Sequence, residues 1–259
     1  ALDASVAAEV QRVLSAGGDV VVVGSEKAVT KDVVDALQRI APDRVERVSG
    51  DDRFGSAVAL AERLTKVTGK STSAPIYLVT GRDHPDALVV VALARRTGGV
   101  VVLSDGDRLP AATRAYLVAN DPTGARTVPV GGAAAKAAAT LDGDAGRTAS
   151  AAAVVGSDRY DTARRVAERF AALDTRDGAK TSVVGLATGK DWPDALTGSA
   201  AMGSLVGPLL LTQGDGLDPA TAKALAALSS GSRPTTFLVF GGEKAVPASA
   251  AKAFAAAAQ

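Results

Sequence analysis

The chain has 259 residues, of which 47% are hydrophobic and 22% charged, so it can form one or two well-buried cores. Its 29 Lys and Arg residues nearly balance 28 Asp and Glu residues, which leaves no strongly basic surface for nucleic acid. The absence of cysteine excludes disulfides, thiolate metal sites and cysteine nucleophiles.

Short apolar runs alternate with amphipathic stretches along the chain. Buried strands are predicted at 19–23, 76–79, 100–103, 127–130, 183–186, 208–211 and 236–239. Continuous β-branched runs are typical of strands covered on both faces, as in a parallel sheet. Helices are predicted at 53–68, 85–97, 110–119 and 133–141, and a proline stands near the start of several of them. The alternation predicts a doubly wound α/β fold for each repeated unit.

Three motifs occur twice in the same order. Gly-Asp-Asp-Arg-Phe at 50–54 returns as Gly-Ser-Asp-Arg-Tyr at 156–160, and His-Pro-Asp-Ala-Leu at 84–88 returns as Trp-Pro-Asp-Ala-Leu at 192–196. Val-Gly-Gly at 130–132 returns as Phe-Gly-Gly at 240–242. Ordered matches of this kind indicate a duplication.

The first residues fit the same scheme, because Gly-Ser-Glu-Lys-Ala-Val at 24–29 matches Gly-Gly-Glu-Lys-Ala-Val at 241–246. We therefore predict the second half of a first repeat at 1–46, a second repeat at 47–141, a linker at 142–152 and a third repeat at 153–259. A half unit would leave a sheet edge uncovered, so residue 1 is expected to be an artificial or proteolytic start of a three-unit protein.

The repeated motifs follow strands and open helices, so their polar groups are expected at the carboxyl edge of the sheets. Two readings stay open for the aspartates at positions 52, 86, 158 and 194: they cap helices, or they contact a ligand. Arg53 and Arg159 oppose the helix dipole, so each is expected to meet a paired carboxylate or an anionic ligand.

The only histidine, His84, is replaced by Trp192 in the next repeat. A catalytic or metal-binding imidazole would not be interchangeable with an indole, so the position indicates aromatic packing or stacking. No nucleophile elbow or His-rich metal motif is present, and neither a metal nor a cofactor is predicted. No apolar run reaches the ~20 residues that would span a membrane.

These motifs resemble the cell wall binding repeat 2 family. The likeness rests on Arg-Val at 47–48, Asp-Arg-aromatic, Pro-Asp-Ala-Leu, Leu-Leu-Leu-Thr at 209–212 and the closing Gly-Gly-x-x-Ala-Val. The resemblance implies Toprim-like α/β units around a pseudo-threefold axis, in a secreted protein of the Gram-positive cell surface. The second repeat departs from the pattern at His84 and Ser56, and the third has Ala153 in place of Arg47.

The resemblance implies a non-catalytic module that anchors a secreted protein, with a linked effector domain outside this chain, to an anionic, teichoic-acid-like wall polysaccharide. The predicted ligand-binding residues are Arg47, Asp52, Arg53, Arg82, Asp86, Asp158, Arg159, Lys190, Trp192 and Asp194. One alternative is a metal-dependent phosphoester-processing enzyme that uses Asp51, Asp52, Asp83 and Asp86, although Asp51 is replaced by Ser157. The other is a purely structural or self-assembly module.

Overall fold

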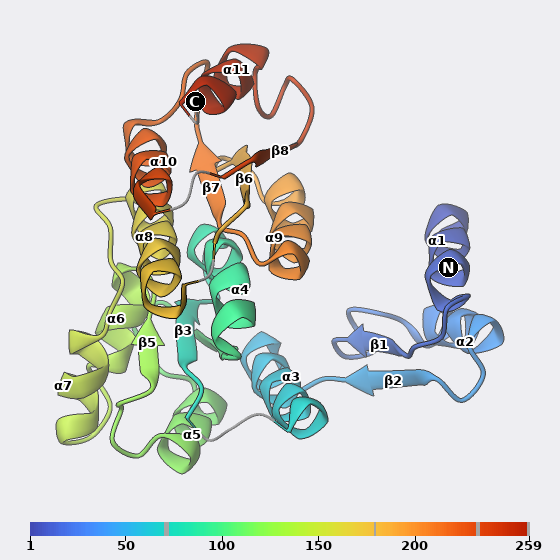
Figure 1. Ribbon diagram of the computed structural model, residues 1–259. Helices are drawn as coiled ribbons and strands as arrows, with labels where there is room; N and C mark the ends of the chain where they lie inside the picture. Colours follow the sequence, from blue (N-terminus) through green and yellow to red (C-terminus); the bar gives the residue numbers. More distant parts are fainter. Residues whose placement is uncertain (70–72, 179, 232–233, 258–259) are drawn as a thin grey trace. The chain divides into compact units, whose positions relative to one another are not determined.

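A computed structural model describes residues 1–69, 73–178, 180–231 and 234–257, and divides the chain into two compact units, Ala1–Gly69 and Lys70–Gln259. The last two residues of the predicted third repeat, 258–259, lie outside the described residues. Both units are mixed α/β with parallel strands (Figure 1).

The first unit is built on a two-stranded parallel sheet. Strand β1 (Val20–Val23) pairs with β2 (Val45–Val48), so that Val23 lies opposite Val48. Three helices accompany the sheet: α1 (Ala4–Leu14), α2 (Lys31–Ile40) and α3 (Arg53–Thr68). The sequence analysis did not predict β2, because Glu46 and Arg47 interrupt its apolar residues.

The second unit contains two three-stranded parallel sheets of the same topology. In the second repeat, β3 (Ile76–Thr80) lies between β4 (Val100–Ser104) and β5 (Thr127–Pro129). In the third repeat, β6 (Val183–Thr188) lies between β7 (Leu209–Thr212) and β8 (Thr236–Phe240). The central strands β3 and β6 are buried along their whole length, which confirms the prediction of covered parallel sheets.

Helices surround these sheets and join the two repeats (Figure 1). They are α4 (Pro85–Thr97), α5 (Ala111–Asn120), α6 (Gly132–Ala138), α7 (Asp144–Ala151), α8 (Arg159–Asp177), α9 (Pro193–Leu205), α10 (Pro219–Gly231) and α11 (Ala248–Ala256). Helix α4 of the second repeat packs against α8 and α9 of the third. One hydrophobic core, with Val89, Phe170 and Met202 fully buried, therefore runs through both repeats.

The first residues of each complete repeat extend a sheet that lies before the repeat boundary. Strand β2, at the start of the second repeat, pairs with β1. At the equivalent position in the third repeat, Val154 forms a parallel bridge with Val130, beyond the end of β5. A sheet thus takes its last strand, or a bridge, from the beginning of the next sequence repeat.

The segment predicted as a linker, 142–152, contains helix α7, which the sequence analysis did not predict. The helix packs on α6 and β5 and buries Ala145, Gly146 and Ala149. The helix was missed because its buried face consists of alanine and glycine, which give no apolar periodicity in the sequence.

Candidate functional site

The Asp-Arg-aromatic motif forms the same helix start in both units. The Asp52 carboxylate accepts hydrogen bonds from the backbone N–H groups of Phe54 (2.9 Å) and Gly55 (2.8 Å) at the start of α3. The Asp158 carboxylate accepts one from the N–H of Asp161 (2.8 Å) at the start of α8. Both aspartates are therefore helix N-caps, one of the two roles that the sequence allowed.

The glycine that opens this motif is required by close packing. Gly156 donates its N–H to the Thr162 hydroxyl at 3.2 Å, and this hydroxyl donates to the Asp158 carbonyl at 3.0 Å. A Cβ on Gly156 would overlap the backbone nitrogen of Thr162, so no other residue fits. Gly50 donates in the same way to the Ser56 hydroxyl at 3.0 Å.

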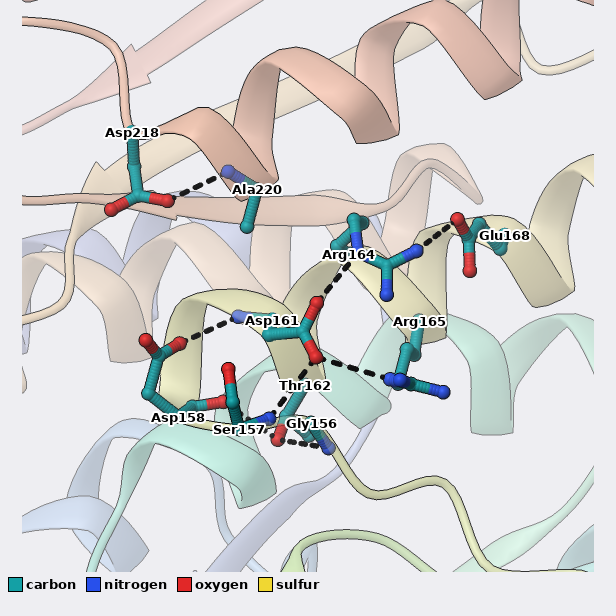
Figure 2. Close-up of polar contacts among 10 residues, drawn as sticks. All are labelled: Gly156, Ser157, Asp158, Asp161, Thr162, Arg164, Arg165, Glu168, Asp218 and Ala220. Atoms are coloured by element: carbon teal, nitrogen blue, oxygen red, sulfur yellow. Dashed lines mark hydrogen bonds and ion pairs between the residues drawn. The ribbon is translucent and has the colours of Figure 1, made fainter.

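The first turns of α8 hold a cluster of charges around Asp161 (Figure 2). The Asp161 carboxylate accepts hydrogen bonds from Arg164 (2.7 Å), from the Ser157 N–H (3.0 Å) and from Arg165 (3.1 Å). Arg164 also pairs with Glu168. The Arg164 hydrogen bond, followed by those from Ser157 and Arg165, lowers the pKa of Asp161 to about 2.

The Pro-Asp-Ala-Leu motif also has the same geometry in both repeats. The carboxylates of Asp83 and Asp191 accept hydrogen bonds from the next N–H group, at 2.9 and 2.8 Å, and a proline then opens α4 or α9. The following aspartate, Asp86, faces Gly131, which has a φ of +88°. A Cβ on this glycine would overlap the Asp86 carboxylate, which explains why the two motifs occur together.

Asp86 is the most perturbed carboxyl group of this edge. Burial, followed by the nearby charge of Asp83, raises the pKa of Asp86 to about 6. Arg159 and a hydrogen bond with Thr162 oppose this rise. A carboxyl group of the second repeat thus has its pKa altered by two residues of the third.

Two of the arginines that were predicted to bind the ligand form contacts within the protein itself. Arg47 donates to the carbonyls of Gly24 (2.5 Å) and Val29 (2.7 Å). Arg82 forms an ion pair with Asp105.

Arg159 joins the second repeat to the third. The side chain donates to the Gly189 carbonyl at 2.6 Å and to the Asp83 carboxylate at 3.1 Å. This pair supplies the carboxylate expected beside Arg159. In the first unit, Arg53 is the first residue of α3 and is exposed. A ligand-binding role for these residues stays a prediction.

Equivalent residues of the two repeats line two pockets, and the pockets differ in charge. The junction pocket, about 380 Å³, is lined by Asp83, Pro85 and Asp86 and by the loop 156–159 of the next repeat. The second pocket, about 430 Å³, is lined by the equivalent Asp191, Pro193 and Asp194 of the third repeat, together with Asp215, Lys190 and Lys244. We call it the lysine pocket.

The lysine pocket lies at the carboxyl end of the sheet of the third repeat. Lys190 and Lys244 are exposed, and neither ammonium group forms an ion pair within the part of the chain that the structure describes. Gln213 follows β7 where Asp105 follows β4, so Lys190 lacks the carboxylate that pairs with Arg82. Trp192, 52% exposed, lies in sequence between Asp191 and Pro193, which line the pocket.

The sequence analysis did not predict Lys244 as a site residue. The available signal was its position three residues after Gly241, at the same edge of the sheet as Lys190. Among the described residues, no group of three or more His, Asp or Glu side chains is placed to hold a metal ion. In the same part of the chain, no helix is both long and apolar enough to cross a bilayer.

Comparisons with known proteins agree with this repeat architecture. The chain is 23% identical over 228 residues to N-acetylmuramoyl-L-alanine amidase LytC of Bacillus subtilis, covering 88% of the chain and 41% of that protein. It is 23% identical over 207 residues to the amidase enhancer of the same organism, covering 80% and 26%. The chain thus spans less than half the length of these relatives.

Two solved structures from Clostridium difficile share the fold. Cwp8 matches with a TM-score of 0.69 and 21% identity, over 93% of this chain and 37% of that one. Cwp6 matches with a TM-score of 0.75 and 18% identity, over 99% and 38%. The model of the family Cell wall binding domain 2 matches residues 47–140 and 154–251, which correspond to the two complete repeats. The chain belongs to this family of cell-wall-binding modules and, with it, to the cell wall and cell surface.

Proposed function

We propose that the chain is a non-catalytic module that anchors its parent protein to an anionic wall glycopolymer of the teichoic-acid kind. The observation that supports this proposal is the lysine pocket, where Lys190 and Lys244 are exposed and form no ion pair among the described residues. The exposed Trp192 stands next in sequence to Asp191 and Pro193 of its wall. Ammonium groups attract phosphates or carboxylates, and an indole can stack on a sugar ring. The Toprim-like description of each unit, and a pseudo-threefold arrangement of three units, remain predictions.

Weak contacts at several repeats would add up along one polymer chain. Arg53, the helix N-termini and Arg82, which stays 70% exposed in its ion pair with Asp105, would supply further contacts. Affinity would come from simultaneous engagement of equivalent edges. The effector that the module anchors would lie elsewhere in the parent protein. The amidase LytC and the amidase enhancer are relatives of which this chain matches only a part, as expected for such a module.

Co-sedimentation with purified cell walls tests the proposal. The protein should pellet with intact walls and stay in the supernatant after chemical removal of the anionic polymer. The pelleted fraction should also fall as salt is raised, because exposed charges are screened. Equal binding to intact and stripped walls would contradict the proposal.

Reversing the charge of the two lysines tests whether the polymer binds at the lysine pocket. The double variant Lys190→Glu and Lys244→Glu should weaken retention by about tenfold or more, since each lost ionic contact contributes about 1 kcal/mol. The control is Lys223→Glu with Lys252→Glu, which makes the same change of net charge at exposed positions of α10 and α11. If both double variants lose binding equally, the effect is one of net charge and the lysine pocket is not the site.

A further inference from the structure

A third cavity lies between the sheet of the second repeat and α8, towards the amino-terminal ends of β3 and β5. It has a volume of about 310 Å³ and is lined by Tyr77, Leu93, Val128, Val154 and Leu173, with Arg169 and Arg176. These residues come from β3, α4, β5, the start of the third repeat and α8. We call it the α8 cavity.

The wall of the α8 cavity is apolar, although the cavity is open at the surface of α8. Tyr77 and Leu93 are buried to 3% and 2% exposure, and the Tyr77 hydroxyl is engaged with Thr97 at 3.1 Å. The cavity therefore offers few polar groups to a sugar, whose hydroxyls need hydrogen-bond partners. An alkyl chain needs none, and its burial is favoured by roughly 0.8 kcal/mol per methylene.

Two arginines, Arg169 and Arg176, line the open side of the cavity. Arg165, Arg169 and Arg176 are exposed and follow one another along one face of α8, with Ala172 between the last two. Arg165 pairs with Asp161 and Arg176 with Asp177, but Arg169 forms no ion pair among the described residues. Its guanidinium donates one hydrogen bond, to the Ala152 carbonyl at 3.2 Å.

The charge of Arg169 acts into the cavity from its exposed side. It acts on the Tyr77 hydroxyl and opposes the rise in the pKa of Tyr77 that burial causes. The Arg169 side chain also lines a smaller neighbouring pocket with Ala153, Val154, Arg165 and Glu168, and Glu168 is paired with Arg164. A guanidinium with free donors at the mouth of an apolar cavity fits an anionic head group.

We propose that the α8 cavity binds a single-chain amphiphilic anion, with its alkyl chain against Tyr77, Leu93 and Leu173 and its phosphate or carboxylate on Arg169. The volume is at the lower end of the range for small-molecule sites, which suits one unbranched chain. This proposal is independent of wall binding, because the lysine pocket and the α8 cavity lie on the sheets of different repeats and share no residue.

The test is titration of the intact protein with decyl phosphate below its critical micelle concentration, with binding measured by calorimetry. The fluorescence of Trp192, which does not line the cavity, serves as the control and should stay unchanged. Decyl phosphate should bind saturably at one site, and inorganic phosphate should not bind there. Arg169→Gln should weaken binding about tenfold, while Arg147→Gln, an exposed arginine of α7, should leave it unchanged. Equal binding by both variants would overturn the proposal.

A second pair of variants tests the cavity itself. Ala172→Trp places a large side chain at the exposed rim of the cavity and should abolish binding, whereas Thr175→Trp, exposed on α8 away from the cavity, should not. Thermal unfolding of both variants checks that α8 still folds. A protein that binds phosphatidylglycerol vesicles but not dispersed decyl phosphate would also overturn the proposal, because its arginines would then be sensing an anionic surface.

Discussion

Asp86 shows how a single residue links two sequence motifs and two repeats. Its carboxylate faces Gly131 of its own repeat and lies near Arg159 and Thr162 of the next. The sequence predicted the aspartate and the glycine as separate features at the strand ends. Their contact could not be predicted, because it depends on the pairing of β3 with β5.

The raised pKa of Asp86 makes stability depend on pH near neutrality. The folded protein holds the proton up to about pH 6, whereas the unfolded chain releases it near the ordinary value of 3.8. Stability therefore falls as pH rises from about 4 to 6, and the loss persists above pH 6. Asp86→Asn should remove this loss and stabilise the protein by up to about 3 kcal/mol at pH 7.5, with no gain at pH 4.

Urea unfolding of the wild type and Asp86→Asn between pH 4 and 8 measures this difference. The matched variant Asp194→Asn changes the equivalent residue of the third repeat, beside Lys190 and Lys244, and should give no such gain. A difference between wild type and Asp86→Asn that is the same at every pH would show that burial of the charge is not the cause.

At the scale of the element, capping residues decided how well the sequence predicted the helices. Helices α3 and α4 begin and end where predicted, because Asp52 or Pro85 marks the start and a left-handed glycine follows the end. Strand β2 and helix α7 were missed, since neither has the apolar pattern of its class. Their positions are set by pairing with β1 and by packing of small residues on α6.

The N-terminal turns of α8 should lose stability in acid. Asp161 has a lowered pKa, so its contribution is fully present above the ordinary value of 3.8 and is lost as pH falls towards 2. Asp161→Asn should therefore destabilise the protein by about 1 kcal/mol at pH 7 and by much less at pH 2.5. Chemical unfolding at the two pH values measures this. Asp177→Asn, at the exposed end of the same helix, should have a smaller effect, and an equal effect would contradict the assignment.

At the scale of the whole molecule, the second and third repeats depend on each other. The sheet of the second repeat is extended by Val154 of the third, and α4 is covered by α8 and α9. The self-comparison of the sequence predicted that the units are equivalent, but not that their sheets cross the repeat boundary. The pairing of strands across the repeat boundary arises from tertiary packing, so a sequence repeat of about a hundred residues does not reveal it.

The ion pair between Asp83 and Arg159 offers a measure of this dependence within the second unit. Asp83→Asn keeps the acceptor for the His84 N–H and removes only the charge, while Arg159→Ala also removes the donor to the Gly189 carbonyl. Because both side chains are partly exposed, a double-mutant cycle should give a coupling of about 0.5 kcal/mol. Arg159→Ala alone should cost about 1–2 kcal/mol, since the carbonyl loses its partner.

The cycle requires the free energy of unfolding in urea for four proteins: the wild type, the two single variants and the double variant. If the repeats unfold together, all variants shift one cooperative transition, and its slope with denaturant stays constant. A transition that splits in Arg159→Ala would show that this contact, more than the shared core around Phe170 and Met202, couples the repeats. We expect a single transition, because that core is continuous from α4 to α10 and buries far more apolar surface than one ion pair can replace.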